Sequence, residues 1–165
     1  MSDAVYFWFP STRIVKETAA PSDQNPEMTF NDPDFPNQSY LGPNGVNLTP
    51  LYDTYRGTGV RIGVVDTGID YTDVELAGQV DTAAGWDGLQ GDSDPLNIGG
   101  DQHGTDVSKF LAAQADNFED GVGAAPEATL VGFRMATRSA RTKEQELDLL
   151  QRQWQVDISH NSCPT

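Results

Sequence analysis

The chain has 165 residues, of which 37% are hydrophobic, so it is long enough for one domain with a moderate core. Its 25 acidic and 10 basic residues give a formal net charge of −15, which argues against nucleic acid or anionic membrane as a partner, because phosphate binding requires clustered Lys and Arg. A single cysteine excludes a disulfide within the chain, and we find neither a membrane-spanning apolar stretch nor a secretory signal layout.

Residues 1–50 are predicted to form a lead segment, and residues 51–165 the first part of a folded domain. From residue 17 to residue 50 the lead is rich in Pro, Asn, Asp and Gly. Such a composition is typical of an extended surface segment with turns rather than of a helix.

The domain begins with a short apolar run, Val60 to Val65, which predicts a strand buried on both faces. A loop with many turn formers and acids is expected over residues 85–102. The following HGTDVSKFLAAQ predicts a helix that begins near His103, with an apolar face formed by Val107, Phe110 and Leu111.

A second strand is predicted from Ala128 to Met135 and a third from Val156 to Ser159. Between them, Thr142 and Gln145 fit a capping box that opens a helix, and apolar residues follow at helical spacing: Leu147, Leu150 and Trp154. This alternation of strands and helices predicts an α/β fold, a parallel sheet with helices on both faces.

Candidate catalytic residues lie where such a fold places its chemistry, just beyond the carboxyl ends of the strands. Asp66 follows the first strand and His103 opens the next helix. An isolated Asp after a strand, or an isolated His at a helix start, is more often a turn, cap or surface residue. The surrounding motifs therefore decide whether the pair has a function.

Three ordered motifs resemble those of the subtilisin-like serine proteases. They are VVDTG at residues 64–68, HGT at residues 103–105 and GVGAAPEA at residues 121–128. In the lead, NDPDFPNQ at residues 31–38 is similar to the segment that opens the catalytic domain in the kexin and furin branch. The resemblance implies the N-terminal part of a subtilisin-like peptidase domain, hence an incomplete subtilisin-like fold.

The implied activity is that of a serine endopeptidase with an Asp-His-Ser triad acting on polypeptides. His103 would be the general base and Asp66 the carboxylate that orients it. No Ser lies in a nucleophile-like GTS context, and no oxyanion-hole Asn segment is present. The 165 residues alone are therefore predicted to be inactive, with the missing C-terminal half of the domain as a possible partner. The family implies an extracellular or cell-surface protein.

The resemblance also implies a structural calcium ion. The matching positions are two acids, one amide and three backbone carbonyls: Asp32, Glu75, Asn117, Gln114, Glu119 and Gly121. Oxygen ligands from scattered segments suit calcium, although solvated surface acids are the alternative interpretation in so acidic a chain. A second cluster, Asp87, Asp92 and Asp94, is a weaker candidate.

The strand that pairs with the substrate backbone is expected at Ser159, Asn161 and Ser162. Several positions depart from the family pattern. Ser108 and Lys109 stand where the family commonly has Ala-Gly, and Thr67 replaces the acid that helps furin-like enzymes select basic substrates. A Pro in the C-terminal tripeptide CPT would remove a backbone donor near the substrate strand.

Two other interpretations remain open. In an aspartic protease, Asp66 would be half of a carboxylate pair, but that leaves HGT unexplained and requires an all-β fold. The chain could instead be a catalytically inactive, calcium-stabilised α/β module that binds peptides or a partner.

Overall fold

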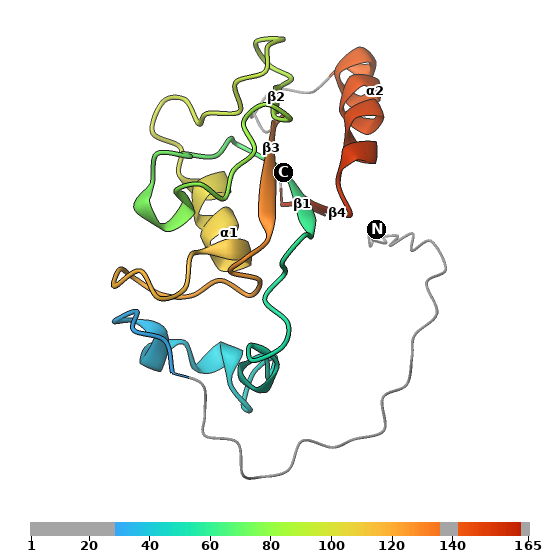
Figure 1. Cartoon of the computed structure of the whole chain (residues 1–165). Helices are drawn as coiled ribbons and strands as arrows, with labels where there is room; N and C mark the ends of the chain where they lie inside the picture. Colours follow the sequence, from blue (N-terminus) through green and yellow to red (C-terminus); the bar gives the residue numbers. More distant parts are fainter. Residues whose placement is uncertain (1–28, 136–141, 163–165) are drawn as a thin grey trace, which may run out of the picture.

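The computed structural model describes residues 29–135 and 142–162. Its strands are β1 (Arg61–Asp66), β2 (Trp86–Asp87), β3 (Thr129–Arg134) and β4 (Ile158–Asn161), and its α-helices are α1 (His103–Ala112) and α2 (Lys143–Arg152). The strands form one parallel sheet in the order β2-β3-β1-β4 (Figure 1). The predicted α/β class is confirmed, and no helix in the described ranges has the length and hydropathy of a membrane span.

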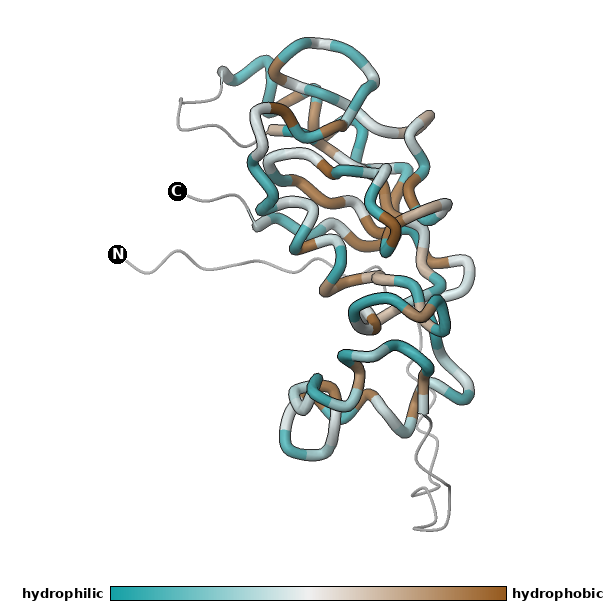
Figure 2. The backbone as a smooth tube through the Cα atoms, turned by 90° about the vertical axis from the view of Figure 1, so that its left-hand side faces the viewer, coloured by the Kyte–Doolittle hydropathy of each residue, from teal (hydrophilic) through white to brown (hydrophobic). Residues whose placement is uncertain are grey.

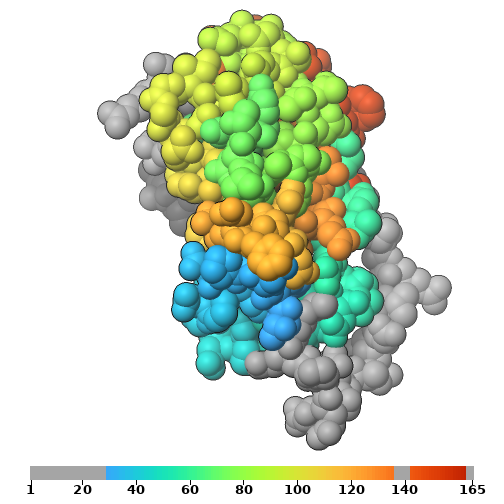
Figure 3. All heavy atoms as spheres, turned by 60° about the vertical axis from the view of Figure 1, so that its left-hand side comes forward, coloured from blue at the N-terminus to red at the C-terminus, as the bar shows by residue number. Residues whose placement is uncertain are grey.

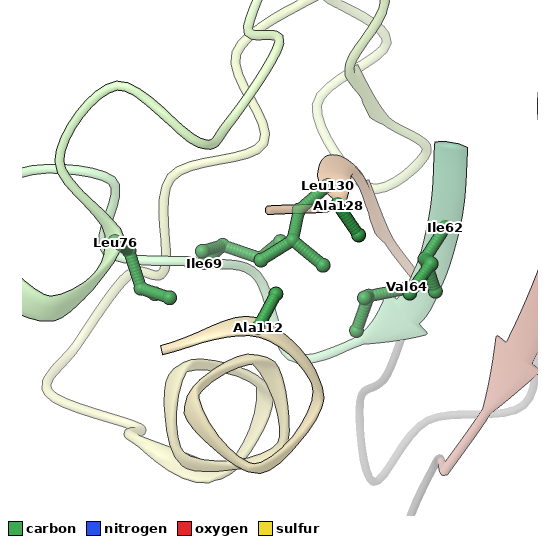
Figure 4. Packing of buried hydrophobic residues seen from close by; sticks show 7 residues of the cluster. All are labelled: Ile62, Val64, Ile69, Leu76, Ala112, Ala128 and Leu130. Atoms are coloured by element: carbon green, nitrogen blue, oxygen red, sulfur yellow. The ribbon is translucent and has the colours of Figure 1, made fainter. Parts of the chain in front are cut away.

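Strand β1 lies between β3 and β4, and its apolar side chains alternate between two covered faces of the sheet. Ile62 and Val64 pack in a cluster with Ala112 of α1, whereas Val65 packs in a second cluster with Leu149 of α2. Figure 4 shows the first cluster gathered between the sheet and the helix, and Figure 2 shows hydrophobic stretches alternating with hydrophilic ones along the backbone. The two helices therefore lie on opposite faces of the sheet, as the sequence predicts.

The described part of the lead segment has turns and no α-helix, as predicted, but it is more compact than an extended surface chain. From residue 29 onward it makes three 3₁₀ turns, at Phe35–Asn37, Ser39–Leu41 and Thr49–Leu51. Its Phe30 builds a small core with Tyr52 and Val122 of the domain, and the segment packs beside the chain that precedes β3 (Figure 3). Burial of aromatic side chains makes this segment compact, which its Pro-rich composition did not indicate. Residues 17–28 of the predicted extended stretch lie outside the described part.

Both helices are confirmed, but their predicted apolar faces are only partly buried: in α1, Val107 and Leu111 pack against the core as expected. In α1 the side facing the sheet is made of small residues, Gly104, Thr105, Ser108 and Ala112, and Phe110 is 62% exposed. In α2 the capping box is present and Leu149 is buried, whereas Leu147 and Leu150 are exposed, as is Trp154 in the 3₁₀ turn Gln153–Gln155 that follows. Small side chains allow α1 to lie close to the sheet, whereas bulky ones would hold it away. The distance between helix and sheet is set by the tertiary structure, so the apolar pattern of the sequence does not show which side is buried.

The edge strands were the least predictable elements. The sequence predicts a loop where the structure has β2. The two residues of β2 pair with Phe133 and Arg134 of β3, which lie far away along the chain. Strand β4 begins two residues later than predicted and pairs with β1. Three of its four residues are exposed, so β4 is an open edge of the described sheet.

Candidate catalytic site and its relatives

Asp66 is the last residue of β1, and its side chain is completely buried. Its Oδ1 atom accepts a hydrogen bond from the backbone N–H of Thr67 at 2.7 Å. Its Oδ2 atom is buried and has no hydrogen-bond partner in the described residues. Burial at the end of β1 therefore fixes the position of this carboxyl group.

His103 is the first residue of α1, and its Nδ1 atom lies 2.7 Å from Asp66 Oδ1. This distance confirms the predicted contact between the two side chains. The hydrogen bond to Asp66 is the largest influence and raises the pKa of His103; burial opposes it, and the charges of Asp66, Asp101 and Asp106 add to it. The imidazole side chain is 44% exposed, so its ring is open to solvent.

The residues around this pair fix the start of α1 against the end of β1. Thr67 Oγ1 accepts a hydrogen bond from Gly104 N at 3.0 Å, and Thr105 Oγ1 accepts one from Asp70 N at 2.9 Å. A Cβ atom on Gly104 would lie 2.3 Å from the carbonyl oxygen of Gly68, so only glycine fits there. Sequence reasoning missed the positioning roles of Thr67 and Thr105, although both belong to the DTG and HGT motifs.

The pair has the geometry of a general base. With Nδ1 bonded to a carboxylate, the neutral imidazole carries its proton on Nδ1 and its lone pair on Nε2. Among the described residues no serine hydroxyl bonds to this ring. Ser108 Oγ, which is buried in α1, donates instead to the Gly104 carbonyl at 2.7 Å.

The three side chains expected to bind calcium lie together. Asp32 and Glu75 are buried, and Asn117 Nδ2 donates to Glu75 Oε1 at 3.0 Å. The Asn117 backbone N–H is directed at Asp32 Oδ1 at 3.5 Å, and that of Asp116 donates to Asp32 Oδ2 at 2.8 Å. Glu75 Oε2 is buried without a hydrogen-bond partner in the described part. Two buried carboxylates, one with an unsatisfied oxygen, fit a hard cation such as calcium.

Burial is the largest influence on Glu75 and raises the pKa of its carboxyl, while the hydrogen bond from Asn117 acts in the opposite direction. Of the expected backbone ligands, Gln114 donates its N–H to the Glu75 carbonyl, and Glu119 N donates to Asn117 Oδ1 at 3.0 Å. Gly121 lies against the side chain of Gln38. The expected segments therefore converge, although Asn117 would have to turn its amide to present Oδ1.

The second acidic cluster does not come together as a metal site. Asp87 pairs with Arg134 and accepts backbone N–H groups, while Asp92 and Asp94 accept N–H groups of their own loop. No group of three His, Cys, Asp or Glu side chains in the described ranges is arranged to hold a metal ion. The cation beside the buried Asp87 is Arg134, whose side chain is 12% exposed and whose pairing the sequence did not indicate.

The expected substrate-pairing residues lie at the open edge of the sheet. Ser159 and Asn161 belong to β4, and Ser162 follows it with its N–H directed at the Val65 carbonyl at 3.4 Å. Asn161 Nδ2 donates to Ser159 Oγ at 3.2 Å. The CPT tripeptide, where a proline was expected to interfere, lies outside the described residues.

Comparison with known proteins assigns a family to this arrangement. The sequence model of the Subtilase family matches residues 57–163. Thermitase from Thermoactinomyces vulgaris is 36% identical over 111 residues, which cover 67% of this chain and 38% of thermitase. Furin from Bos taurus is 35% identical over 114 residues, which cover 63% of this chain and 14% of furin.

Solved structures agree with the sequence match. The crystal structure of a serine protease of Aeromonas sobria superposes with a TM-score of 0.69 at 26% identity, over 87% of this chain and 27% of that one. The chain thus spans 38% of thermitase and smaller parts of these other two proteins. Thermitase matches this chain at slightly higher identity and over a larger share of it than furin does, which supports the family and not its kexin and furin branch. This chain belongs to the subtilase family of serine proteases, of which it covers the N-terminal part of the catalytic domain.

Proposed function

We propose that this chain supplies the general base, His103, and the orienting carboxylate, Asp66, of a serine endopeptidase that cleaves polypeptides. The observation that carries the proposal is the 2.7 Å contact between the two side chains, made by a buried carboxylate at a strand end and a partly exposed imidazole at a helix start. The family match over residues 57–163 supports this assignment.

In the proposed reaction, Nε2 of neutral His103 takes the proton of a serine hydroxyl as its oxygen attacks the peptide carbonyl carbon. The imidazolium, stabilised by Asp66, then gives this proton to the leaving amine nitrogen. The serine and the oxyanion-hole donors would come from the part of a subtilase domain that lies beyond the matched residues. The 165 residues alone are expected to lack protease activity, since loss of one oxyanion donor costs about 10²–10³ in turnover and loss of the nucleophile costs more.

The open edge of β4 supports a role in substrate binding. Ser159, Asn161 and Ser162 are proposed to pair with the extended backbone of the substrate, as a strand added to the sheet. The same edge is also where further strands of a complete subtilase domain could join. A substrate preference for paired basic residues is not proposed, because Thr67 is buried at the expected acid position.

A structural calcium ion is the second part of the proposal. Asp32, Glu75 and Asn117 would bind it and tie the lead segment to the domain, with the unsatisfied Glu75 Oε2 as the supporting observation. Calcium should then raise the melting temperature, because a ligand that binds only the folded state stabilises it by mass action. Equal melting curves in calcium and in chelator would contradict this part.

The catalytic proposal can be tested in a chimera in which residues 57–163 replace the matched part of thermitase. Cleavage of casein or of a chromogenic peptide is expected, and His103→Ala should reduce turnover by about 10⁶. Lys143→Gln, a charge change on the opposite face of the sheet, is the control and should have no effect. A chimera that unfolds cooperatively but cleaves nothing would favour the inactive peptide-binding module.

A further inference from the structure

Lys109 joins three segments that meet at the proposed calcium site. It lies on α1, and its ammonium nitrogen is 2.7 Å from Asp73 Oδ2 and 3.7 Å from Asp120 Oδ2. Asp73 caps the 3₁₀ turn that carries Glu75, because its Oδ1 accepts the N–H of Glu75 at 2.9 Å. Asp120 belongs to the loop that carries Asn117. One cation on the helix therefore links both ligand-bearing segments.

The charges that act on Glu75 are mostly negative. Asp120 and Asp32 both disfavour its ionised form, and Lys109 is the cation that favours it. Glu75, Lys109 and Asp120 line the same pocket, which has a volume of about 390 Å³. Through this pocket a small ion from solvent could reach the buried carboxylate.

From this geometry we propose that the Lys109 ammonium is a resident counter-ion that opposes calcium binding. Without calcium, Lys109 compensates the negative charge of the cluster and holds α1 to the ligand-bearing segments. With calcium bound, the same ammonium lies near a divalent cation and repels it. The inference rests on the proposed calcium site and is independent of the proposed catalysis.

The expected antagonism is a Coulomb repulsion between the Lys109 ammonium and a bound calcium ion. The Lys109 side chain is 28% exposed, so solvent and salt screen its charge less than that of a fully exposed lysine. The Lys109 ammonium pairs with Asp73 and Asp120 and lines the same pocket as Glu75, to which calcium would bind, so the ammonium and the bound ion repel each other. Removing Lys109 should therefore raise the affinity for calcium and lower the stability of the calcium-free chain.

The experiment measures calcium binding by isothermal titration calorimetry and thermal melting in calcium and in chelator. The variant Lys109→Met is expected to bind calcium on the order of tenfold more tightly than the wild type and to melt at a lower temperature in chelator. Lys109→Arg keeps the charge and should stay within about twofold of the wild type. Lys143→Met removes the same charge from α2 and should leave the affinity unchanged.

Each outcome decides the proposal. An unchanged or weakened calcium affinity in Lys109→Met would overturn it while leaving the calcium site intact. Absence of calcium binding in every variant would overturn both. If Lys109→Met unfolds in chelator, refolding on addition of calcium would support the proposal, whereas failure to refold together with wild-type affinity in Lys109→Gln would refute it.

Discussion

Replacing Asp66 with Asn removes the carboxylate that bonds to His103 and keeps the shape of the side chain. The wild-type contact is short, 2.7 Å, and its carboxylate is fully buried. A hydrogen bond to a charged group contributes roughly 1.5–3 kcal/mol. Because the His103 side chain is 44% exposed, we discount this value for solvent screening to about 1 kcal/mol.

The sign of the pH dependence follows from the raised pKa of His103. The folded-state pKa lies above the ordinary value of 6.5 because of the hydrogen bond to Asp66. The stability contributed by the protonated pair is therefore fully present below pH 6.5 and is lost as the pH rises through the folded-state pKa. Between about pH 6 and pH 9, the free energy of unfolding of the wild type should fall by about 1 kcal/mol more than that of Asp66→Asn.

The assay combines urea unfolding at both pH values with NMR titration of the imidazole C–H signals, assigned with the variant His160→Gln. In Asp66→Asn the pKa of His103 should fall below its wild-type value. The matched control is Asp101→Asn, because Asp101 also raises the pKa of His103 but contacts only its backbone N–H. It should lower the pKa less. The same His103 titration in the wild type and Asp66→Asn would refute the argument.

Three further changes test the packing and the acid cluster. Gly104→Ala should destabilise the chain by about 1–3 kcal/mol and shift the His103 signals, because the new Cβ clashes with backbone, whereas Gly42→Ala, whose Cβ would make ordinary contact, should be nearly neutral in urea unfolding. Leu149→Ala should cost about 2–4 kcal/mol and the exposed Leu147→Ala less than about 0.5 kcal/mol, and equal costs would contradict the burial of Leu149. Burial raises the pKa of Glu75 above its ordinary value of 4.5. At pH values above 4.5 the ionised carboxylate therefore opposes folding. Glu75→Gln should therefore melt no lower than the wild type in chelator at pH 7 and should lose the response to calcium; a preserved response would remove Glu75 from the site.

Local sequence signals predicted most of the elements and the contact between Asp66 and His103. The β-branched run before Asp66 and the capping box at Thr142 determine a strand and a helix start within a few residues, through side-chain burial and local hydrogen bonds. The motifs DTG and HGT identified Asp66 and His103, since their chemistry depends on residue type and order. These features are encoded over short stretches of chain, so they can be read without the fold.

Tertiary contacts decided the rest. Strand β2 exists because it pairs with β3, and Asp87 lost its role as a candidate ligand because the fold places Arg134 beside it. Likewise, Lys109 has its position near the acid cluster only through the packing of α1 on residues distant in sequence. The sequence by itself determined the residues capable of the chemistry, whereas the tertiary structure alone decided which charges meet, because pairing across long separations leaves no local pattern.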